Sequence, residues 1–189
     1  SSSLLLQGKR ILITGGGRGI GRSIAVICYQ EGANVIITSR TKQELEETIR
    51  IATTTNTESR SSSESSSNNV SSSLSQIVDA STILDIVINN AGGAQTKKGP
   101  IGTLESNDFE SLFKLNVLGP QLITSTIMKY NYNKIIVNIS SKAGKIGIEN
   151  MSHYVATKFA LEGLTSSWSK ELYSQGIRVH SISPGMINT

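Results

Sequence analysis

Short apolar runs alternate with amphipathic stretches along almost the whole chain. The apolar runs are rich in β-branched residues and show no clean polar alternation, which predicts buried strands. The predicted strands are 9–14, 34–38, 84–90, 134–140 and 177–183. Between them, apolar residues recur three and four positions apart, which predicts helices. The predicted helices are 20–29, 41–52, a weaker one at 70–78, 107–130, which is interrupted or bent at Gly119-Pro120, and 151–174.

This alternation indicates a parallel sheet covered by helices on both faces. Right-handed crossovers lead to the doubly wound α/β fold of Rossmann type, whose ligand crevice lies at the carboxyl ends of the strands. Most of the glycine-rich and polar motifs follow predicted strands, so they fall at that edge. The 189 residues suffice for one domain, 1–189, and are too few for two of ordinary size.

A polar tract interrupts the alternation between Thr53 and Thr82, where Ser, Thr and Asn predominate. Its centre, TESRSSSESSSNNVSSS (57–73), offers almost no apolar side chain to bury. We therefore expect 56–69 to be disordered or weakly held.

Composition argues against several classes of function. The net charge is +4, but no run of Lys and Arg is dense enough for a nucleic-acid patch. The single cysteine, Cys28, can form no internal disulfide and reads as a buried core thiol in a reducing compartment. No apolar run approaches the ~20 residues that span a bilayer, so a cytoplasmic location without a membrane span is expected. No His, Cys, Asp and Glu cluster has the spacing of metal ligands.

The sequence TGGGRGIG (14–21) directly follows the first predicted strand and opens the first predicted helix. Glycines there allow a tight turn and a close approach of the backbone to a phosphate, while the helix N-terminus offers free N–H groups and partial positive charge. The spacing is Gly15-x-x-x-Gly19-x-Gly21 instead of the common dinucleotide pattern G-x-G-x-x-G. The position of the loop nevertheless favours a phosphate site over a merely structural turn.

The end of the second predicted strand discriminates between nicotinamide cofactors. A site for NAD(H) has an acid near this point, which holds the ribose hydroxyl. Here the chain has Ser39 followed by Arg40, and Arg18 in the glycine loop adds a second cation. A guanidinium suits a 2′-phosphate, whereas a carboxylate would repel it. These residues predict NADP(H) over NAD(H); the alternative is that both arginines are simply solvated.

Six short motifs stand in order along the chain. They are TGGGRGIG, NNAG (89–92), Asn116 in KLNVLG, NISSKAG (138–144), YVATK (154–158) and SPGMINT (183–189). In this order and at these intervals they resemble the short-chain dehydrogenase/reductase family over nearly the full chain. The resemblance implies a nicotinamide-dependent oxidoreductase that acts on small-molecule alcohols and carbonyls, and a homodimer or homotetramer when full length.

The resemblance also assigns roles to individual residues. The family's catalytic tetrad falls on Asn116, Ser141, Tyr154 and Lys158, with Ser141 preferred to Ser140 because of its distance from Tyr154 along the chain. The residues implied to bind the cofactor are Gly15, Gly17, Arg18, Gly19, Ile20, Gly21, Ser39, Arg40, Asn89, Ala91, Gly92, Tyr154, Lys158, Pro184, Gly185 and Thr189.

The spacing of Tyr154 and Lys158 suits proton transfer. On a helix the two side chains share one face, so the ammonium can lie near the phenol. A nearby positive charge favours the phenolate and makes the tyrosine a usable acid and base. Ser141 would hydrogen-bond the substrate oxygen, and Asn116 would hold a water that connects Lys158 to solvent.

Two features depart from the family pattern. The family has a third strand after the second helix; here it is either absent or formed from IRIATTT (49–55), which is poor material for a strand. Family members also continue beyond Thr189 with a substrate lid and a final strand, so we expect the last strand of the sheet to be missing. The leading hypothesis is hydride transfer between NADP(H) and a carbonyl or secondary alcohol. The alternatives are a non-catalytic NADP-binding module and an inactive fragment of a longer reductase.

Overall fold

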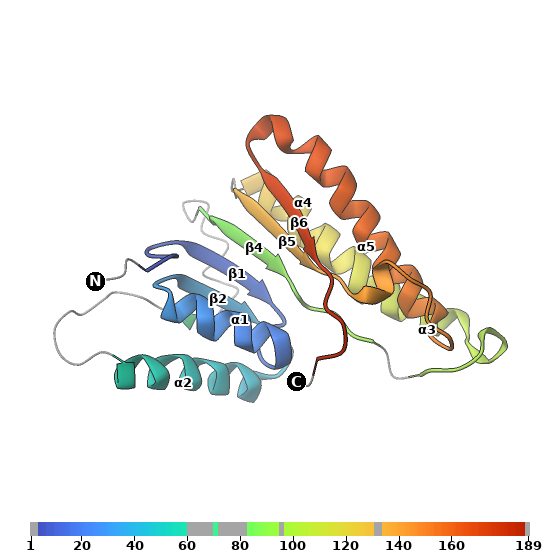
Figure 1. The fold of residues 1–189 in the computed structure, drawn as a ribbon, viewed down its shortest axis with the longest axis horizontal. Coiled ribbons are helices and arrows are strands. Elements are labelled where there is room, and N and C mark those ends of the chain that lie inside the picture. Colours follow the sequence, from blue (N-terminus) through green and yellow to red (C-terminus); the bar gives the residue numbers. More distant parts are fainter. Residues whose placement is uncertain (1–3, 60–69, 72–82, 95–96, 131–133, 188–189) are drawn as a thin grey trace. The chain divides into compact units, whose positions relative to one another are not determined.

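The computed structural model describes residues 4–59, 70–71, 83–94, 97–130 and 134–187 (Figure 1). These residues form two compact units. The first unit holds the described residues of 1–90, and the second holds those of 91–130 and 134–188. We describe each unit by itself.

The first unit contains four parallel strands in the order β3-β2-β1-β4. The strands are β1 (Arg10–Thr14), β2 (Asn34–Thr38), β3 (Val70–Ser71) and β4 (Ile86–Asn89). β1 and β2 pair over their whole length, with Arg10 opposite Asn34 and Thr14 opposite Thr38. Because the two strands end level, the glycine loop after β1 and the Ser39-Arg40 segment after β2 leave the sheet at the same edge.

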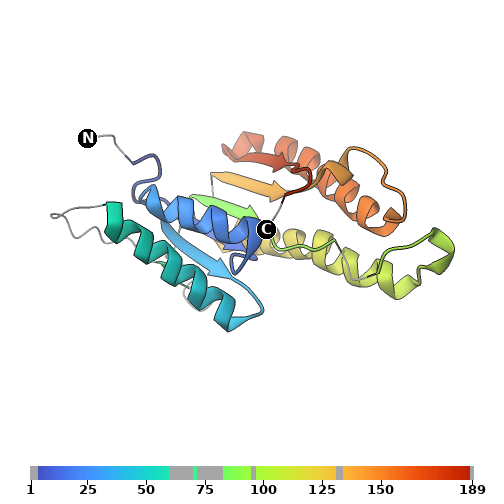
Figure 2. The same ribbon diagram turned by 60° about the horizontal axis from the view of Figure 1, so that its bottom comes forward.

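Two helices, α1 (Gly19–Gln30) and α2 (Lys42–Ser59), lie side by side in this unit (Figures 1 and 2). The side of α1 that is buried carries Ala25, Cys28 and Tyr29, at the spacing of one helical face. Burial raises the pKa of the Cys28 thiol to about 11, so this cysteine is a core residue and a poor nucleophile at neutral pH.

The structure corrects the prediction for the segment after β2. The helix continues past residue 52 to Ser59, so IRIATTT is helical and does not form the third strand. In this part of the helix Thr53 donates to the Ile49 carbonyl at 3.0 Å and Thr54 to the Arg50 carbonyl at 2.8 Å. Both hydroxyls are therefore hydrogen-bonded within the helix.

The third strand exists, but in a place that the sequence pattern did not indicate. Val70 lies opposite Val35 in β3, whereas the weak pattern at 70–78 predicted a helix there. The strand is only two residues long and lies at the edge of the sheet, which fits the scarcity of apolar residues around it. The rest of that predicted helix and residues 60–69 lie outside the described residues.

The second unit pairs two parallel strands with a set of helices. The strands are β5 (Ile135–Ile139) and β6 (Arg178–Ile182). The α-helices are α3 (Ser106–Phe113), α4 (Gly119–Tyr130) and α5 (Ser152–Glu171). Shorter helical segments are the π-helix η3 (Lys114–Leu118) and the 3-10 turns η2 (Ile101–Thr103), η4 (Lys142–Gly144) and η5 (Tyr173–Gln175).

The core of this unit lies between its strands and helices. Ile136, Ile177 and Val179 are buried and contact Met128 of α4 and Trp168 of α5. β5 and β6 also end level, with Ile139 opposite Ile182. The segments Ser140-Ser141 and Ser183-Pro184 therefore leave their strands at the same edge.

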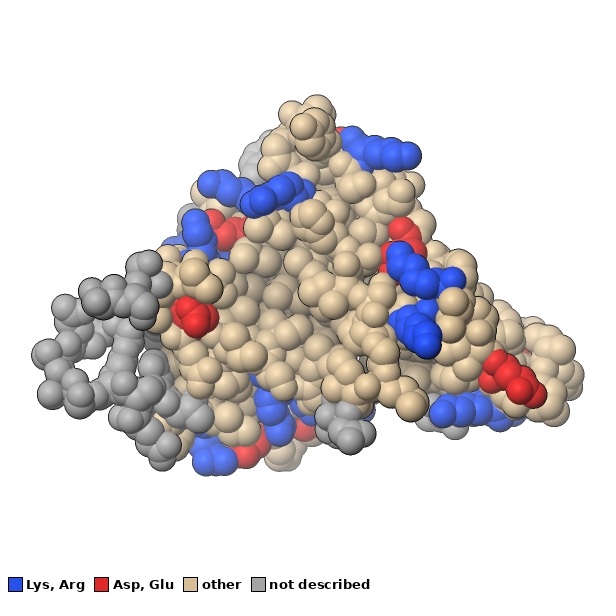
Figure 3. Space-filling view, viewed as in Figure 1, with Lys and Arg blue, Asp and Glu red and all other residues tan. Residues whose placement is uncertain are grey.

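The parallel strands with intervening helices confirm the predicted α/β fold of Rossmann type. At the predicted interruption, Gly119-Pro120, the π-helix η3 has ended at Leu118 and α4 begins at Gly119. On the face shown in Figure 3, acidic and basic side chains are interspersed, as expected for solvated charge. Within the described residues, no helix is long and apolar enough to cross a membrane.

The burial of Ile37 gives a test of the first unit. Ile37 is fully buried in the middle of the sheet, so Ile37→Ala should lower the free energy of unfolding by about 2–5 kcal/mol. Ile27→Ala is the matched control, because Ile27 is 58% exposed on α1 and its loss should change stability by about 0.5 kcal/mol or less. Denaturant unfolding measures both; equal losses in the two variants would contradict the assigned core.

Candidate functional site

The glycine loop joins β1 to α1 and presents the helix N-terminus. The cap residue Arg18 has an extended backbone and makes no side-chain cap, and the first turn of α1 holds no acid. No side chain of the cap therefore hydrogen-bonds the first N–H groups of the helix, and no acid in the first turn compensates the positive end of its dipole. This end of α1 suits an anion such as a phosphate.

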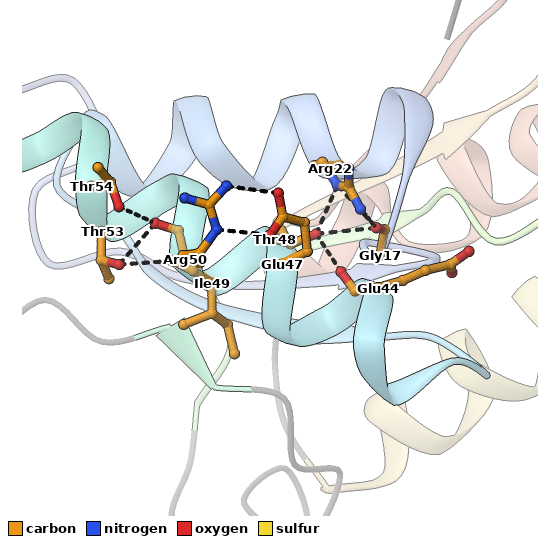
Figure 4. Close-up of polar contacts among 9 residues, drawn as sticks. All are labelled: Gly17, Arg22, Glu44, Glu47, Thr48, Ile49, Arg50, Thr53 and Thr54. Atoms are coloured by element: carbon orange, nitrogen blue, oxygen red, sulfur yellow. Dashed lines mark hydrogen bonds and ion pairs between the residues drawn. The ribbon is translucent and has the colours of Figure 1, made fainter.

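Two side chains from the helices hold the loop backbone in place (Figure 4). The Thr48 hydroxyl of α2 is fully buried and lies 3.0 Å from the Gly16 carbonyl and 3.2 Å from the Gly17 carbonyl. Arg22 of α1 donates from Nε to the Gly17 carbonyl at 3.0 Å and to Thr48 Oγ1 at 3.1 Å. Sequence reasoning missed both residues, because neither belongs to a glycine motif.

The NNAG motif contributes a third support for the loop. Asn90 donates from Nδ2 to the Thr14 carbonyl at 3.0 Å and to the Gly15 carbonyl at 3.1 Å. A Cβ at Gly21 would collide with the Gly15 carbonyl oxygen and Asn90 Nδ2, so glycine is required at this close approach. The predicted cofactor residue Asn89 lies buried at the end of β4.

An acid on α2 lies beside the segment that follows β2, and the sequence analysis missed it. Glu44 of α2 accepts a hydrogen bond from Ser39 Oγ at 3.2 Å, and its Oε1 lies 3.8 Å from Nε of Arg18. Arg40 is exposed and has no ion-pair partner among the described residues. The structure thus brings together the predicted Arg18 and Ser39, but places a carboxylate between them.

The four predicted catalytic residues all belong to the second unit. Tyr154 and Lys158 are one turn apart on α5, and the Lys158 Nζ lies 5.8 Å from the centre of the Tyr154 ring. Lys158 is buried and donates to the Ile139 carbonyl at 3.0 Å. The two side chains therefore share one face of the helix, within the range of a cation–π contact.

Two opposing effects act on the pKa of Lys158. Burial lowers its pKa to about 8, and the negative charge of Glu162, one turn further along α5, opposes this effect. At pH 7 most of the lysine remains protonated, so a cation lies next to the Tyr154 ring.

The side chain of Asn116 is locked by neighbouring segments. Its Oδ1 accepts from the Gly93 N–H, and its Nδ2 donates to the Gly93 carbonyl and to Thr157 Oγ1, each at 3.0 Å. Thr157 in turn donates to the Tyr154 carbonyl at 2.8 Å. Because Pro120 has no N–H to donate to the carbonyl four residues before it, the main-chain oxygen of Asn116 is left without that helical bond.

Ser141 begins the η4 turn, which packs against α5. Its Oγ accepts from the Ala143 N–H at 3.1 Å and is half-buried, whereas Ser140 is 5% exposed. This difference in exposure favours Ser141 over Ser140 as the serine that a ligand can reach. A Cβ at Gly144 would lie 3.0 Å from the Lys158 carbonyl oxygen, so glycine is needed for η4 to approach the helix this closely.

Glu162 of α5 binds side chains of two neighbouring segments, and the sequence analysis missed it as well. It accepts from Lys145 Nζ at 2.8 Å, Ser181 Oγ at 2.8 Å and Ser183 Oγ at 2.7 Å. Burial disfavours its charge, but the hydrogen bonds from Lys145 and the serines outweigh this and lower its pKa to about 2. The sequence held a signal, because Glu162 continues the four-residue spacing of Tyr154 and Lys158.

The segment after β6 runs beside η4. The Pro184 carbonyl accepts from the Lys142 N–H at 2.9 Å, and the Ile182 carbonyl accepts from the Ser140 N–H at 2.7 Å. Gly185 is exposed, as is Gly92 after β4, while Ala91 is half-buried. Thr189 lies outside the described residues.

Comparisons with known proteins show the family to which the chain belongs. The sequence model of the short chain dehydrogenase family matches residues 9–189. An uncharacterised oxidoreductase of Thermotoga maritima is 35% identical over 185 residues, which cover 95% of this chain and 72% of the relative. A 3-oxoacyl-[acyl-carrier-protein] reductase, FabG, of the same organism is 29% identical over 189 residues, covering 97% of this chain and 76% of the relative.

Two solved structures have the same fold. A candidate short-chain dehydrogenase of Escherichia coli CFT073 in complex with NADPH superposes with a TM-score of 0.80 at 25% identity, covering 98% of this chain and 80% of that one. Carveol dehydrogenase of Mycobacterium avium in complex with NAD superposes with a TM-score of 0.84 at 23% identity, covering 100% of this chain and 74% of that one.

The Glu162 network predicts a pH-dependent stability. Because the pKa of Glu162 is about 2 in the folded protein against an ordinary 4.5, its contribution is present above pH 4.5 and is lost as the pH falls toward 2. Glu162→Gln should therefore lower the free energy of unfolding at pH 7 by about 1–3 kcal/mol, and by progressively less as the pH falls through this window. Denaturant unfolding at pH 7 and pH 3 measures the difference.

Glu171→Gln is the control for this prediction, since Glu171 is exposed at the end of the same helix. It should change stability little at either pH. A Glu162→Gln loss that is as large at pH 3 as at pH 7 would contradict the ionised network.

Proposed function

The chain belongs to the short-chain dehydrogenase family of oxidoreductases, and from that premise we propose that it transfers hydride between NADP(H) and a carbonyl or secondary alcohol. Tyr154 is the acid and base of the reaction. The observation that carries the proposal is the buried Lys158 ammonium, 5.8 Å from the Tyr154 ring on the same face of α5. Nicotinamide cofactors, which the family uses, supply or accept the hydride when bound.

The residues of the second unit then have distinct tasks. In reduction, the Tyr154 hydroxyl gives its proton to the developing alkoxide, and the Lys158 charge stabilises the phenolate that remains. Ser141 donates a hydrogen bond to the same substrate oxygen, where negative charge develops in the transition state. The main-chain carbonyl of Asn116 holds a water that returns the proton from solvent through Lys158.

Residues of the first unit support NADP(H) as the cofactor. The N-terminus of α1 suits the pyrophosphate, and the loop around it is held by Thr48, Arg22 and Asn90 without an acid in its first turn. Arg18, Ser39 and Arg40 offer two cations and a hydroxyl to a 2′-phosphate. The two solved structures hold NADPH and NAD, so the preference rests on these side chains and not on the fold.

An apolar stripe on the second unit supports a homo-oligomer. Leu115, Leu118 and Leu122 recur three and four positions apart along η3 and α4 and are 37%, 44% and 59% exposed. Phe113, 38% exposed, borders an apolar pocket on the same segment. Exposed apolar side chains that are aligned in this way are typical of protein–protein contacts, and we propose that a second copy of the chain covers them.

Replacement of Tyr154 tests the catalytic role. Tyr154→Phe should lower kcat by about 10²–10⁴ because the proton donor is lost, and should leave the Kd of NADPH nearly unchanged. Nicotinamide absorbance with a panel of ketones gives kcat, and fluorescence titration gives Kd. Tyr173→Phe is the control, since Tyr173 is 79% exposed and outside the site.

Turnover by Tyr154→Phe at the unsubstituted rate would disprove the acid–base assignment. Tight NADPH binding by the unsubstituted protein without turnover of any ketone would instead support the non-catalytic NADP-binding module.

The apolar stripe gives a test of assembly. Leu122→Glu places a charge on the proposed contact, so it should shift the protein from dimer or tetramer toward monomer at micromolar concentration. Sedimentation velocity measures this shift. Ile27→Glu, on the exposed side of α1, should leave the assembly intact; a monomeric unsubstituted protein would disprove the proposal.

A further inference from the structure

We infer that Glu44 limits the preference of this chain for NADP(H), because its carboxylate competes with the 2′-phosphate for Arg18 and Ser39. The inference rests on the proposed cofactor site in the first unit. Glu44 lies on α2, five positions beyond Ser39, and Ser39 occupies the position at which an NAD(H) site carries its acid.

The carboxylate makes the contacts that a phosphate would make. Ser39 Oγ donates to Glu44 Oε2 at 3.2 Å, and Arg18 Nε lies 3.8 Å from Glu44 Oε1. The carboxylate therefore already neutralises one of the two cations proposed for the 2′-phosphate.

The backbone and stem of Glu44 are held close to the loop. The Glu44 carbonyl accepts from Thr48 Oγ1 at 2.9 Å, and that same hydroxyl lies 3.2 Å from the Gly17 carbonyl (Figure 4). A Cβ at Gly17 would lie 2.9 Å from Glu44 Cβ and 2.9 Å from Ser39 Oγ. A 2′-phosphate can displace the carboxylate by rotating the side chain, but the charge stays near because its stem does not move.

The two cofactors meet this carboxylate differently. A phosphate monoester carries about −1.5 to −2 charges at pH 7, so a carboxylate within a Debye length of ~8 Å repels it. The 2′-hydroxyl of NAD(H) is neutral and can donate a hydrogen bond to the same carboxylate. Glu44 therefore opposes NADP(H) and favours NAD(H).

Arg40 lies outside this competition. It is exposed, and it has no ion pair among the residues that the structure describes. Arg40 can thus bind a 2′-phosphate while Arg18 is shared with Glu44. The preference for NADP(H) therefore depends on two opposing effects. Arg18 and Arg40 attract the 2′-phosphate, and Glu44 repels it.

Cofactor titration of the full chain tests the inference. Glu44→Gln keeps the shape of the side chain and removes its charge, so it should tighten NADPH binding by about tenfold and leave NADH binding unchanged or weaker. Fluorescence or calorimetric titration with each cofactor gives the two Kd values. Adenosine 2′,5′-bisphosphate, which carries the 2′-phosphate without the nicotinamide, should show the same tightening.

Glu46→Gln is the matched control. Glu46 lies on the same helix, pairs with Lys42 and makes none of the loop contacts, so its loss should change neither Kd. An unchanged ratio of the NADPH and NADH Kd values in Glu44→Gln overturns the inference, and so does an equal shift in Glu46→Gln.

Failure of the proposed cofactor preference gives a different result. Arg40→Ala should weaken NADPH and adenosine 2′,5′-bisphosphate but not NADH. If it weakens neither, the proposed 2′-phosphate site is wrong, whatever Glu44→Gln does. If the unsubstituted chain binds neither the cofactors nor the bisphosphate, both proposals are wrong.

Discussion

The second unit depends on one buried cation. Lys158 lies inside the protein, where burial opposes its charge and lowers its pKa to about 8. Its charge is maintained by the Ile139 carbonyl at 3.0 Å and by the negative field of Glu162. An uncompensated ammonium in this position would be strongly destabilising, so the surrounding polar groups are required by the lysine itself.

These compensating groups also order the rest of the candidate site. Glu162 fixes the end of β6 and the residue after it through Ser181 and Ser183, and it fixes the segment after η4 through Lys145. Elsewhere on α5, Thr157 joins the Tyr154 carbonyl to the Asn116 amide. The proposed acid–base pair is therefore embedded in a network in which side chains of α5 hold the neighbouring segments. Positioning of this kind is what catalysis by a fixed proton donor requires.

The sequence predicted the helices and strands that depend on local pattern. The prediction failed for elements that depend on contacts with residues far away in the sequence or that carry little pattern. The apolar runs placed β1, β2 and β5 to within a residue or two, because strands buried on both faces have little freedom in composition. Helix α2 was predicted too short, because residues 53–59 are polar and carry no apolar periodicity. β3 was missed because two residues at a sheet edge carry almost no pattern.

The same distinction applies to the candidate site. Tyr154 and Lys158 could be paired from their spacing of four residues. The same spacing, continued by one helical turn, leads to Glu162. Glu44 and Thr48 could not be placed in this way, because only the packing of α1 beside α2 brings them to the glycine loop.

The charged residues of the two proposed sites also differ in their exposure to solvent. Lys158 is buried and Glu162 nearly so, whereas the side chains of Arg18 and Glu44 are 78% and 31% exposed. Interactions between exposed charges are weakened by salt and by the flexibility of long side chains, while buried ones are screened much less. A change of one exposed charge can therefore alter cofactor selectivity without disturbing the fold, whereas a change in the buried network affects stability and chemistry together. Substitutions in the first unit can therefore change cofactor selectivity in small steps. In the second unit, the groups proposed for proton transfer are held in place by the same buried contacts that stabilise the fold.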